Sequence, residues 1–148
     1  MKLVLIVEDE YGNAEILQLL LEAEGYRVAL ASNGQQALDL LRAGEKPALI
    51  LSDFMMPVMN GAEFGRAVSQ NDALSQIPFV FMSATSEELV RAGYDGYDAF
   101  LVKPTELDTL LEVVGRLIAQ GRSARRPGAQ AQETVRQLLG AVHAPARD

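Results

Sequence analysis

Residues 49–61 read LILSDFMMPVMNG, and the way this stretch ends points to the fold. An uninterrupted apolar run stops at a single carboxylate, Asp53, and three methionines and Pro57 follow it. A strand that is apolar on both faces is typical of the interior of a parallel sheet. A carboxylate beside such an interior costs free energy unless its charge is compensated. We therefore predict that Asp53 has partners from elsewhere in the chain.

The apolar run before Asp53 is one of five that alternate with helical patterns. The runs occupy residues 3–7, 27–31, 48–52, 79–82 and 99–102, and the helical segments occupy residues 11–25, 33–44, 62–70, 85–93 and 105–119. Gly25 and Gly44 suit the position just after a helix. Five apolar strands, each followed by a helix, predict an α/β fold: a doubly wound, five-stranded parallel sheet with five helices, plus a C-terminal tail.

Composition restricts the class of protein further. The chain has 148 residues, 49% of them hydrophobic, which suits one domain with a core of its own. No apolar stretch approaches the roughly 20 residues of a membrane helix, and the N-terminus turns acidic too early for a secretory signal. We expect a cytoplasmic protein without a membrane partner. Cysteine is absent, which excludes disulfides, thiolate nucleophiles and thiolate metal sites.

Charge divides the chain into two parts. Residues 1–121 carry 8 basic and 18 acidic side chains, whereas residues 122–148 carry 5 and 2. The overall charge of −7 argues against direct binding of nucleic acid. We expect one domain over residues 1–121, followed by a basic linker and a short amphipathic helix that docks on the domain or on a partner. The apolar positions of that helix are Val135, Leu138, Leu139 and Val142.

Polar side chains stand at the ends of four apolar runs, where a doubly wound sheet binds its ligands. They are Glu8, Asp9 and Glu10 after the first run, Asp53 after the third, Ser83 after the fourth and Lys103 after the fifth. Each has an ordinary explanation by itself, because acids and serines often cap helices and a lysine before proline often lies in a solvated turn. Their joint occurrence favours a site.

The chemistry of this set is specific. Clustered carboxylates repel one another, and a hard divalent cation such as Mg²⁺ neutralises them with oxygen ligands. Lys103 adds a fixed positive charge and Ser83 adds a hydroxyl donor. Phosphoryl transfer to a nucleophilic carboxylate needs these components.

Four segments carry a resemblance to a known family. They are LIVEDE (residues 5–10), ALILSDFMMPVMNG (48–61), VFMSAT (80–85) and FLVKP (100–104). Together they resemble the signature blocks of the receiver domain of bacterial response regulators, over about residues 2–120. The resemblance implies a flavodoxin-like fold and a phosphoacceptor in a two-component or phosphorelay system. It implies Mg²⁺-dependent transfer from phosphohistidine and catalysis only of the domain's own phosphorylation and dephosphorylation.

The resemblance also implies a role for each site residue. Asp53 is the expected phosphoacceptor, and Asp9, Asp53 and the backbone carbonyl of Met55 are expected to hold Mg²⁺, with Glu8 contributing directly or through water. Ser83 and Lys103 are expected to contact the phosphoryl oxygens.

The same resemblance implies a switch. When Asp53 is phosphorylated, Ser83 is expected to move toward the phosphoryl group, and Phe100 is expected to turn inward and change the exposed face. Thr85 and Met55 flank the site and are expected to influence the lifetime of the acyl phosphate.

Three features depart from the family pattern. The acidic pair is Glu8–Asp9 where two aspartates are commoner, and Phe100 replaces the usual tyrosine. The interval from Ser83 to Lys103 is about two residues short, which leaves barely two turns for the fourth helix. Because the family signals through the face of that helix, the fifth strand and the fifth helix, we expect an unusual switching surface.

Partners are expected by the same resemblance. They are a sensor histidine kinase or a histidine phosphotransfer protein, a downstream protein target, and a second copy bound through the face of the fourth helix, fifth strand and fifth helix. The expected contacts with the phosphodonor are Gly12, Asn13, Ile16, Pro104 and Thr105.

Two other classes remain open from the sequence. A phosphate-ester hydrolase with an aspartate nucleophile usually has a second acid two residues after it, where this chain has Met55. A pseudo-receiver would keep the fold without phosphorylation. The site residues count against it, and the short fourth helix leaves it open.

Overall fold

A computed structural model describes residues 1–121 of the chain, and the helix expected near residues 135–142 lies outside them. Five strands and five helices alternate along the described chain, as the sequence predicts. The elements are β1 (Leu3–Val7), α1 (Tyr11–Ala23), β2 (Arg27–Ala31), α2 (Gly34–Arg42), β3 (Leu49–Asp53), α3 (Gly61–Ser69), β4 (Phe79–Ser83), α4 (Glu87–Gly93), β5 (Ala99–Val102) and α5 (Leu107–Gln120).

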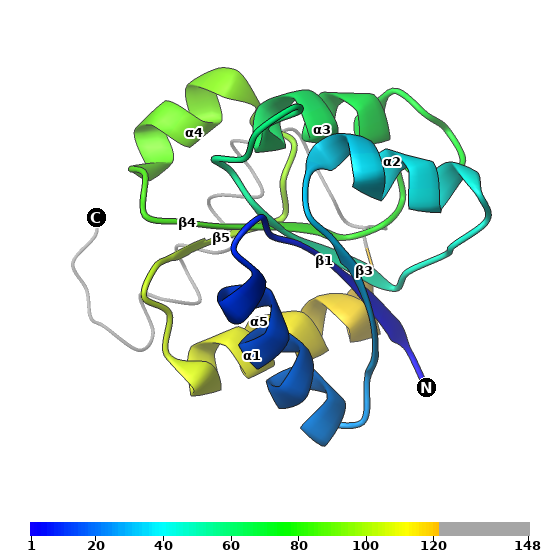
Figure 1. The fold of residues 1–148 in the computed structure, drawn as a ribbon, viewed down its shortest axis with the longest axis vertical. Helices are drawn as coiled ribbons and strands as arrows, with labels where there is room; N and C mark the ends of the chain where they lie inside the picture. Colours follow the sequence, from blue (N-terminus) through cyan, green and yellow to red (C-terminus); the bar gives the residue numbers. More distant parts are fainter. Residues whose placement is uncertain (122–148) are drawn as a thin grey trace.

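The strands form one parallel sheet in the order β2-β1-β3-β4-β5. Helices α1 and α5 cover one face, and α2, α3 and α4 cover the other (Figure 1). The chain leaves β1 for β2 on one side and returns to add β3 on the other side of β1. The order therefore reverses between β1 and β3, and their carboxyl ends border the crevice where such sheets bind ligands.

The sheet has a hydrophobic core on each face, because side chains along a strand alternate between the two faces. Along β1, Val4 and Ile6 pack with the buried residues of α1 and α5, whereas Leu5 and Val7 pack with those of α2, α3 and α4. Alternate side chains of a strand point to opposite faces of the sheet. A strand that is apolar throughout therefore requires helices on both faces, which is the arrangement observed.

Two predicted boundaries shift by one residue around Asp53. The third strand covers residues 49–53 rather than 48–52, so Asp53 is its last residue and not the first residue beyond it. The third helix covers residues 61–69 rather than 62–70. Asn60 and Glu63 fix its start, because each side chain accepts a hydrogen bond from the other's backbone N–H.

The other boundaries differ at the helix ends and at one strand end. The first two helices end at Ala23 and Arg42, and Gly25 and Gly44 each follow the C-cap residue with positive φ angles of 95° and 114°, as expected of glycines just after a helix. Helix α2 begins at Gly34 rather than residue 33, β4 extends to Ser83, and α5 covers residues 107–120 rather than 105–119. Helix ends are decided by capping contacts that apolar spacing does not reveal.

Helix α4 is short, as predicted, with seven residues. Ser86 caps its start by accepting a hydrogen bond from the Leu89 N–H. Its end is attached to α3, where Arg66 donates a hydrogen bond to the carbonyl of Gly93. The helix is therefore held at both ends despite its length. None of the helices within residues 1–121 has the length and apolar character needed to cross a bilayer.

Candidate functional site

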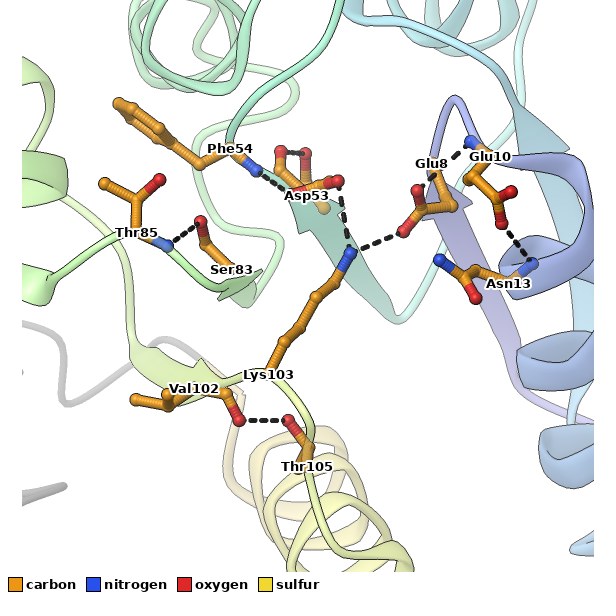
Figure 2. A network of polar contacts seen from close by, with 11 residues as sticks. Glu8, Glu10, Asn13, Asp53, Phe54, Ser83, Thr85, Val102, Lys103 and Thr105 are labelled. Carbon is orange, nitrogen blue, oxygen red and sulfur yellow. Dashed lines mark hydrogen bonds and ion pairs between the residues drawn. The ribbon is translucent and has the colours of Figure 1, made fainter.

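The carboxyl ends of four strands bring together the polar residues that the sequence singled out. Glu8 follows β1, Asp53 and Ser83 end β3 and β4, and Lys103 follows β5. Figure 2 shows the Lys103 side chain extending between Glu8 and Asp53, with Ser83 and Thr85 on the β4 side. Parallel strands place their carboxyl ends at one edge, so residues up to 95 positions apart in the chain are neighbours.

Lys103 joins the two carboxylates. Its Nζ lies 3.0 Å from Glu8 Oε1 and 3.2 Å from Asp53 Oδ2. The side chains of Glu8 and Asp53 are only 4% and 11% exposed, and that of Lys103 is 23% exposed. A buried carboxylate needs a charge partner. The Lys103 ammonium group is the partner predicted for Asp53 from elsewhere in the chain.

The protonation of this cluster reflects burial and pairing. Burial raises the pKa of Glu8 above its usual value, and the hydrogen bonds from Lys103 and from the Glu10 N–H offset only part of that effect. Burial lowers the pKa of Lys103, but the hydrogen bond to Glu8 and the charges of Asp53 and Glu8 outweigh it and raise the pKa. Lys103 is therefore a fixed positive charge at neutral pH.

Backbone groups hold the remaining oxygens. The Phe54 N–H donates to Asp53 Oδ1 at 2.7 Å, and the Glu10 N–H donates to Glu8 Oε2 at 3.1 Å. The Thr85 N–H donates to Ser83 Oγ at 3.0 Å. These contacts orient both carboxylates and the hydroxyl before any ligand binds.

Three carboxylates form a possible cation site. Oxygens of Glu8, Asp9 and Asp53 lie within 4.8 Å of one another, with Glu8 buried, Asp53 partly buried and Asp9 exposed. Three oxygen donors at the rim of a crevice suit a hard cation such as Mg²⁺, which keeps several of its waters. Glu10 lies outside this group and caps α1 by accepting a hydrogen bond from the Asn13 N–H. The metal role of the Met55 carbonyl stays a prediction.

The loop after Asp53 is tightly closed. Val58 has a φ angle of 67°, and the Met59 N–H donates to the Pro57 carbonyl at 2.7 Å. A β-branched residue with positive φ in a three-residue turn is strained. Gly61 N–H donates to the Phe54 carbonyl at 2.8 Å, and a Cβ at Gly61 would lie 2.8 Å from the backbone of Asp53 and Phe54.

A groove of about 430 Å³ opens beside the carboxylates. Four of the five residues expected at the phosphodonor line it: Asn13 and Ile16 of α1, and Pro104 and Thr105 of the β5–α5 loop. Gly12 is exposed at the start of α1 but does not line the groove. Glu8 and Lys103 form part of its wall, so the groove reaches the site.

The expected switch residue Phe100 is already turned inward. Its side chain is 4% exposed and belongs to the core beneath α2, α3 and α4. The expected movement of this ring on phosphorylation stays a prediction. The tyrosine at residue 97 packs against it, with ring centres 6.3 Å apart.

A partly buried contact under α4 was not expected from the sequence. The Tyr97 hydroxyl donates to Glu87 Oε2 at 2.8 Å, and the Tyr97 side chain is fully buried. Asp98 is also buried, and it exchanges two hydrogen bonds with the backbone of Phe79. The segment YDGYD (residues 94–98) looked like a poor continuation of a helix, and the presence of two tyrosines was the available signal that it packs inward.

A model of a known protein family matches most of this chain. It is described as the response regulator receiver domain and matches residues 4–115. The polar-differentiation response regulator DivK of Brucella anthropi is 35% identical over 117 residues, covering 76% of this chain and 93% of DivK. The response regulator Rre1 of Synechocystis is 34% identical over 130 residues, covering 86% of this chain and 56% of Rre1. The chain thus spans little more than half the length of Rre1.

Solved structures give the same result. The signal receiver domain of a signal transduction histidine kinase from Syntrophus aciditrophicus matches with a TM-score of 0.76 and 34% identity, covering 81% of this chain and 92% of that chain. The receiver domain of a sensor histidine kinase from Pseudomonas aeruginosa matches with a TM-score of 0.74 and 26% identity, covering 80% and 98%. That receiver domain has a magnesium ion coordinated in its active site cleft.

Proposed function

The chain belongs to the response regulator receiver domain family of two-component signalling, and on that basis we propose that Asp53 is its phosphoacceptor. The observation that carries the proposal is the Lys103 ammonium group between Asp53 and Glu8, at the reversal of strand order. A carboxylate that is oriented by a backbone N–H and paired with a lysine is placed to attack a phosphoryl group.

The proposed reaction transfers a phosphoryl group from a phosphohistidine. A carboxylate oxygen of Asp53 attacks phosphorus, so that an O–P bond forms while the P–N bond of the donor breaks. The electron pair stays on the imidazole nitrogen, whose ring leaves neutral because its other nitrogen carries a proton. Lys103 and the Ser83 hydroxyl interact with the phosphoryl oxygens and stabilise the charge that they carry.

We propose that Glu8, Asp9, Asp53 and the Met55 carbonyl hold Mg²⁺. The support is the group of three carboxylates with oxygens within 4.8 Å and the magnesium ion in the related Pseudomonas aeruginosa domain. When bound, Mg²⁺ neutralises charge on the carboxylates and on the phosphoryl oxygens. Lys103 pairs with two of these carboxylates, those of Glu8 and Asp53, in the absence of a phosphoryl group.

The phosphodonor is proposed to be a sensor histidine kinase or a histidine phosphotransfer protein. Receiver domains interact with such proteins. The groove beside the site supports this partner, because it reaches Lys103 and is lined by apolar residues of α1 and α5, including Ile16, Leu20 and Leu107. We propose that Gly12 contacts the donor at the rim of the groove.

The output is proposed to be a protein contact through the face of α4, β5 and α5. Leu89 and Val102 expose apolar side chains there, at 64% and 60%. A downstream target or a second copy of the chain would bury these side chains and gain free energy from doing so. Ser83 and Phe100 remain the proposed switch residues, and the ring of Phe100 is buried in the core beneath α2, α3 and α4.

Incubation with Mg²⁺ and acetyl phosphate, followed by intact-mass measurement, tests the phosphoacceptor. We expect one phosphoryl adduct on the wild-type chain, none on Asp53→Asn, and an unchanged adduct on Asp72→Asn, which replaces an exposed aspartate. A folded wild-type chain without an adduct contradicts the proposal and favours a pseudo-receiver. Rapid multiple turnover of small phosphate esters would instead favour a hydrolase.

A further inference from the structure

We propose that the hydrogen bond between Tyr97 and Glu87 is a latch that holds the start of α4 in the conformation described here. The latch opens when Asp53 is phosphorylated, so this inference rests on the proposed function of Asp53. It assigns to Tyr97 a regulatory role beside the one proposed for Phe100, whose buried ring packs against it.

The tyrosine side of the latch is fixed. The Tyr97 ring is fully buried and packs edge-on against Phe81 of β4, with ring centres 5.5 Å apart. It also packs against Phe100 of β5, with ring centres 6.3 Å apart. A ring packed against side chains of two strands cannot follow a moving surface loop, because the interior has no free volume in which to shift it.

The glutamate side of the latch is attached to the site. Ser83 ends β4, and its hydroxyl accepts a hydrogen bond from the Thr85 N–H, two residues before Glu87. Ser86 caps the first turn of α4, so Glu87 moves with that turn. When Ser83 moves toward a phosphoryl oxygen, Thr85 and Glu87 therefore move with it. Tyr97 stays in place.

The two ends of α4 then behave differently. Gly93 at its end is tied to Arg66, and the Tyr94 ring lies where a Cβ on Gly65 of α3 would come within 2.5 Å of it. Opening the latch at Glu87 frees only the first turn. That turn carries Leu89, which is 64% exposed on the proposed output face. The helix is thus expected to pivot about Gly93 and to displace Leu89.

The charge-assisted hydrogen bond stabilises only the latched conformation, so its loss favours the phosphorylated one. Beryllofluoride imitates the phosphoryl group when Mg²⁺ is present. Its affinity for the domain therefore reports the equilibrium between the latched and the phosphorylated conformation. We expect Tyr97→Phe to bind beryllofluoride about tenfold more tightly than wild type. Glu87→Ala removes the acceptor without altering the core and should give a similar gain. Glu88→Gln changes the neighbouring exposed carboxylate and should stay within about twofold of wild type.

A second readout follows the helix itself. In NMR spectra with Mg²⁺ alone, the Leu89 amide signal of Tyr97→Phe should shift toward its position in the wild-type beryllofluoride adduct. Equal affinities in wild type, Tyr97→Phe and Glu87→Ala, with an unmoved Leu89 signal, overturn the latch but leave the phosphoacceptor intact. A wild-type chain that binds no beryllofluoride overturns the proposed function and the latch with it.

Discussion

Two regions of this domain bury polar atoms beside the sheet, and they use different partners. The acidic crevice, formed by Glu8, Asp9 and Asp53, is held by charge, because one lysine contacts two of its carboxylates. The aromatic layer under α4, formed by Phe79, Phe81, Tyr94, Tyr97 and Phe100, is held by ring packing, with ring centres 5.0 to 6.3 Å apart.

This difference indicates which of the two regions a bound ligand can affect directly. Charged groups at a partly open crevice respond to a new cation or to a phosphoryl group. A packed layer responds only when an element at its edge moves, because its rings leave no room for small adjustments. The crevice is therefore suited to receive the signal, and the layer is suited to limit which parts of the fold transmit it.

The largest effect is expected from removing the charge that holds the crevice together. Lys103→Met leaves Glu8 and Asp53 close together without their cation, and should lower the free energy of unfolding by about 3 kcal/mol at pH 7. Mg²⁺ should restore part of this loss by binding the same carboxylates. Guanidinium denaturation with and without Mg²⁺ measures both effects.

The control for Lys103 is Lys46→Met, since Lys46 is an exposed lysine outside the crevice. It should change the free energy of unfolding by less than about 0.5 kcal/mol, with no dependence on Mg²⁺. If the two variants behave alike, the crevice is not held by charge and the contrast between the regions fails.

The next effect tests the packing of the aromatic layer. A Cβ on Gly65 would lie 2.5 Å from the Tyr94 ring, so Gly65→Ala should lower the free energy of unfolding by about 2 kcal/mol through overpacking. Gly115 of α5 is a matched helical glycine, where the nearest atom would lie at 3.6 Å. Gly115→Ala should instead raise stability by about 0.5 kcal/mol, because alanine favours the helix. Thermal unfolding distinguishes them, and a loss of equal size in both variants would speak against a rigid layer.

The smallest effect concerns strain in the loop beside the crevice. Val58 is 81% exposed and has a positive φ angle, so Val58→Gly should raise the free energy of unfolding by about 1 kcal/mol, the relieved strain exceeding the entropy cost of glycine. Val102→Gly, at an exposed position in β5, should lower it by a similar amount. Denaturant titration checks the opposite signs, and a loss in both variants would show that Val58 is not strained.

Sequence reasoning reached the fold and the crevice because both depend on local patterns. Apolar runs that end in polar residues give the strands and, through parallel pairing, the edge where Glu8, Asp53, Ser83 and Lys103 meet. The order of the strands did not have to be known in detail, because the carboxyl ends of all parallel strands point the same way.

The aromatic layer depends on contacts that no local pattern encodes. The bond from Tyr97 to Glu87 joins a loop to a helix across ten residues, and the spacing of neither segment specifies it. The buried Phe100 ring packs against Tyr97, a contact that the apolar spacing of the fifth strand does not specify. The boundary at Gly61 was missed by one residue because a reciprocal pair of capping contacts decides it.

The hydrogen bond from the Gly61 N–H to the Phe54 carbonyl joins the two ends of the β3–α3 loop. The number of residues in this loop is therefore constrained. The segment 43–48, which joins α2 to β3, has no such closure between its ends among the described backbone contacts. One residue added to the β3–α3 loop would have to displace either Asp53 or the start of α3, whereas one added at residues 44–46 would extend an exposed turn. We therefore expect the domain to tolerate an inserted residue in the segment before β3 but not in the loop after it.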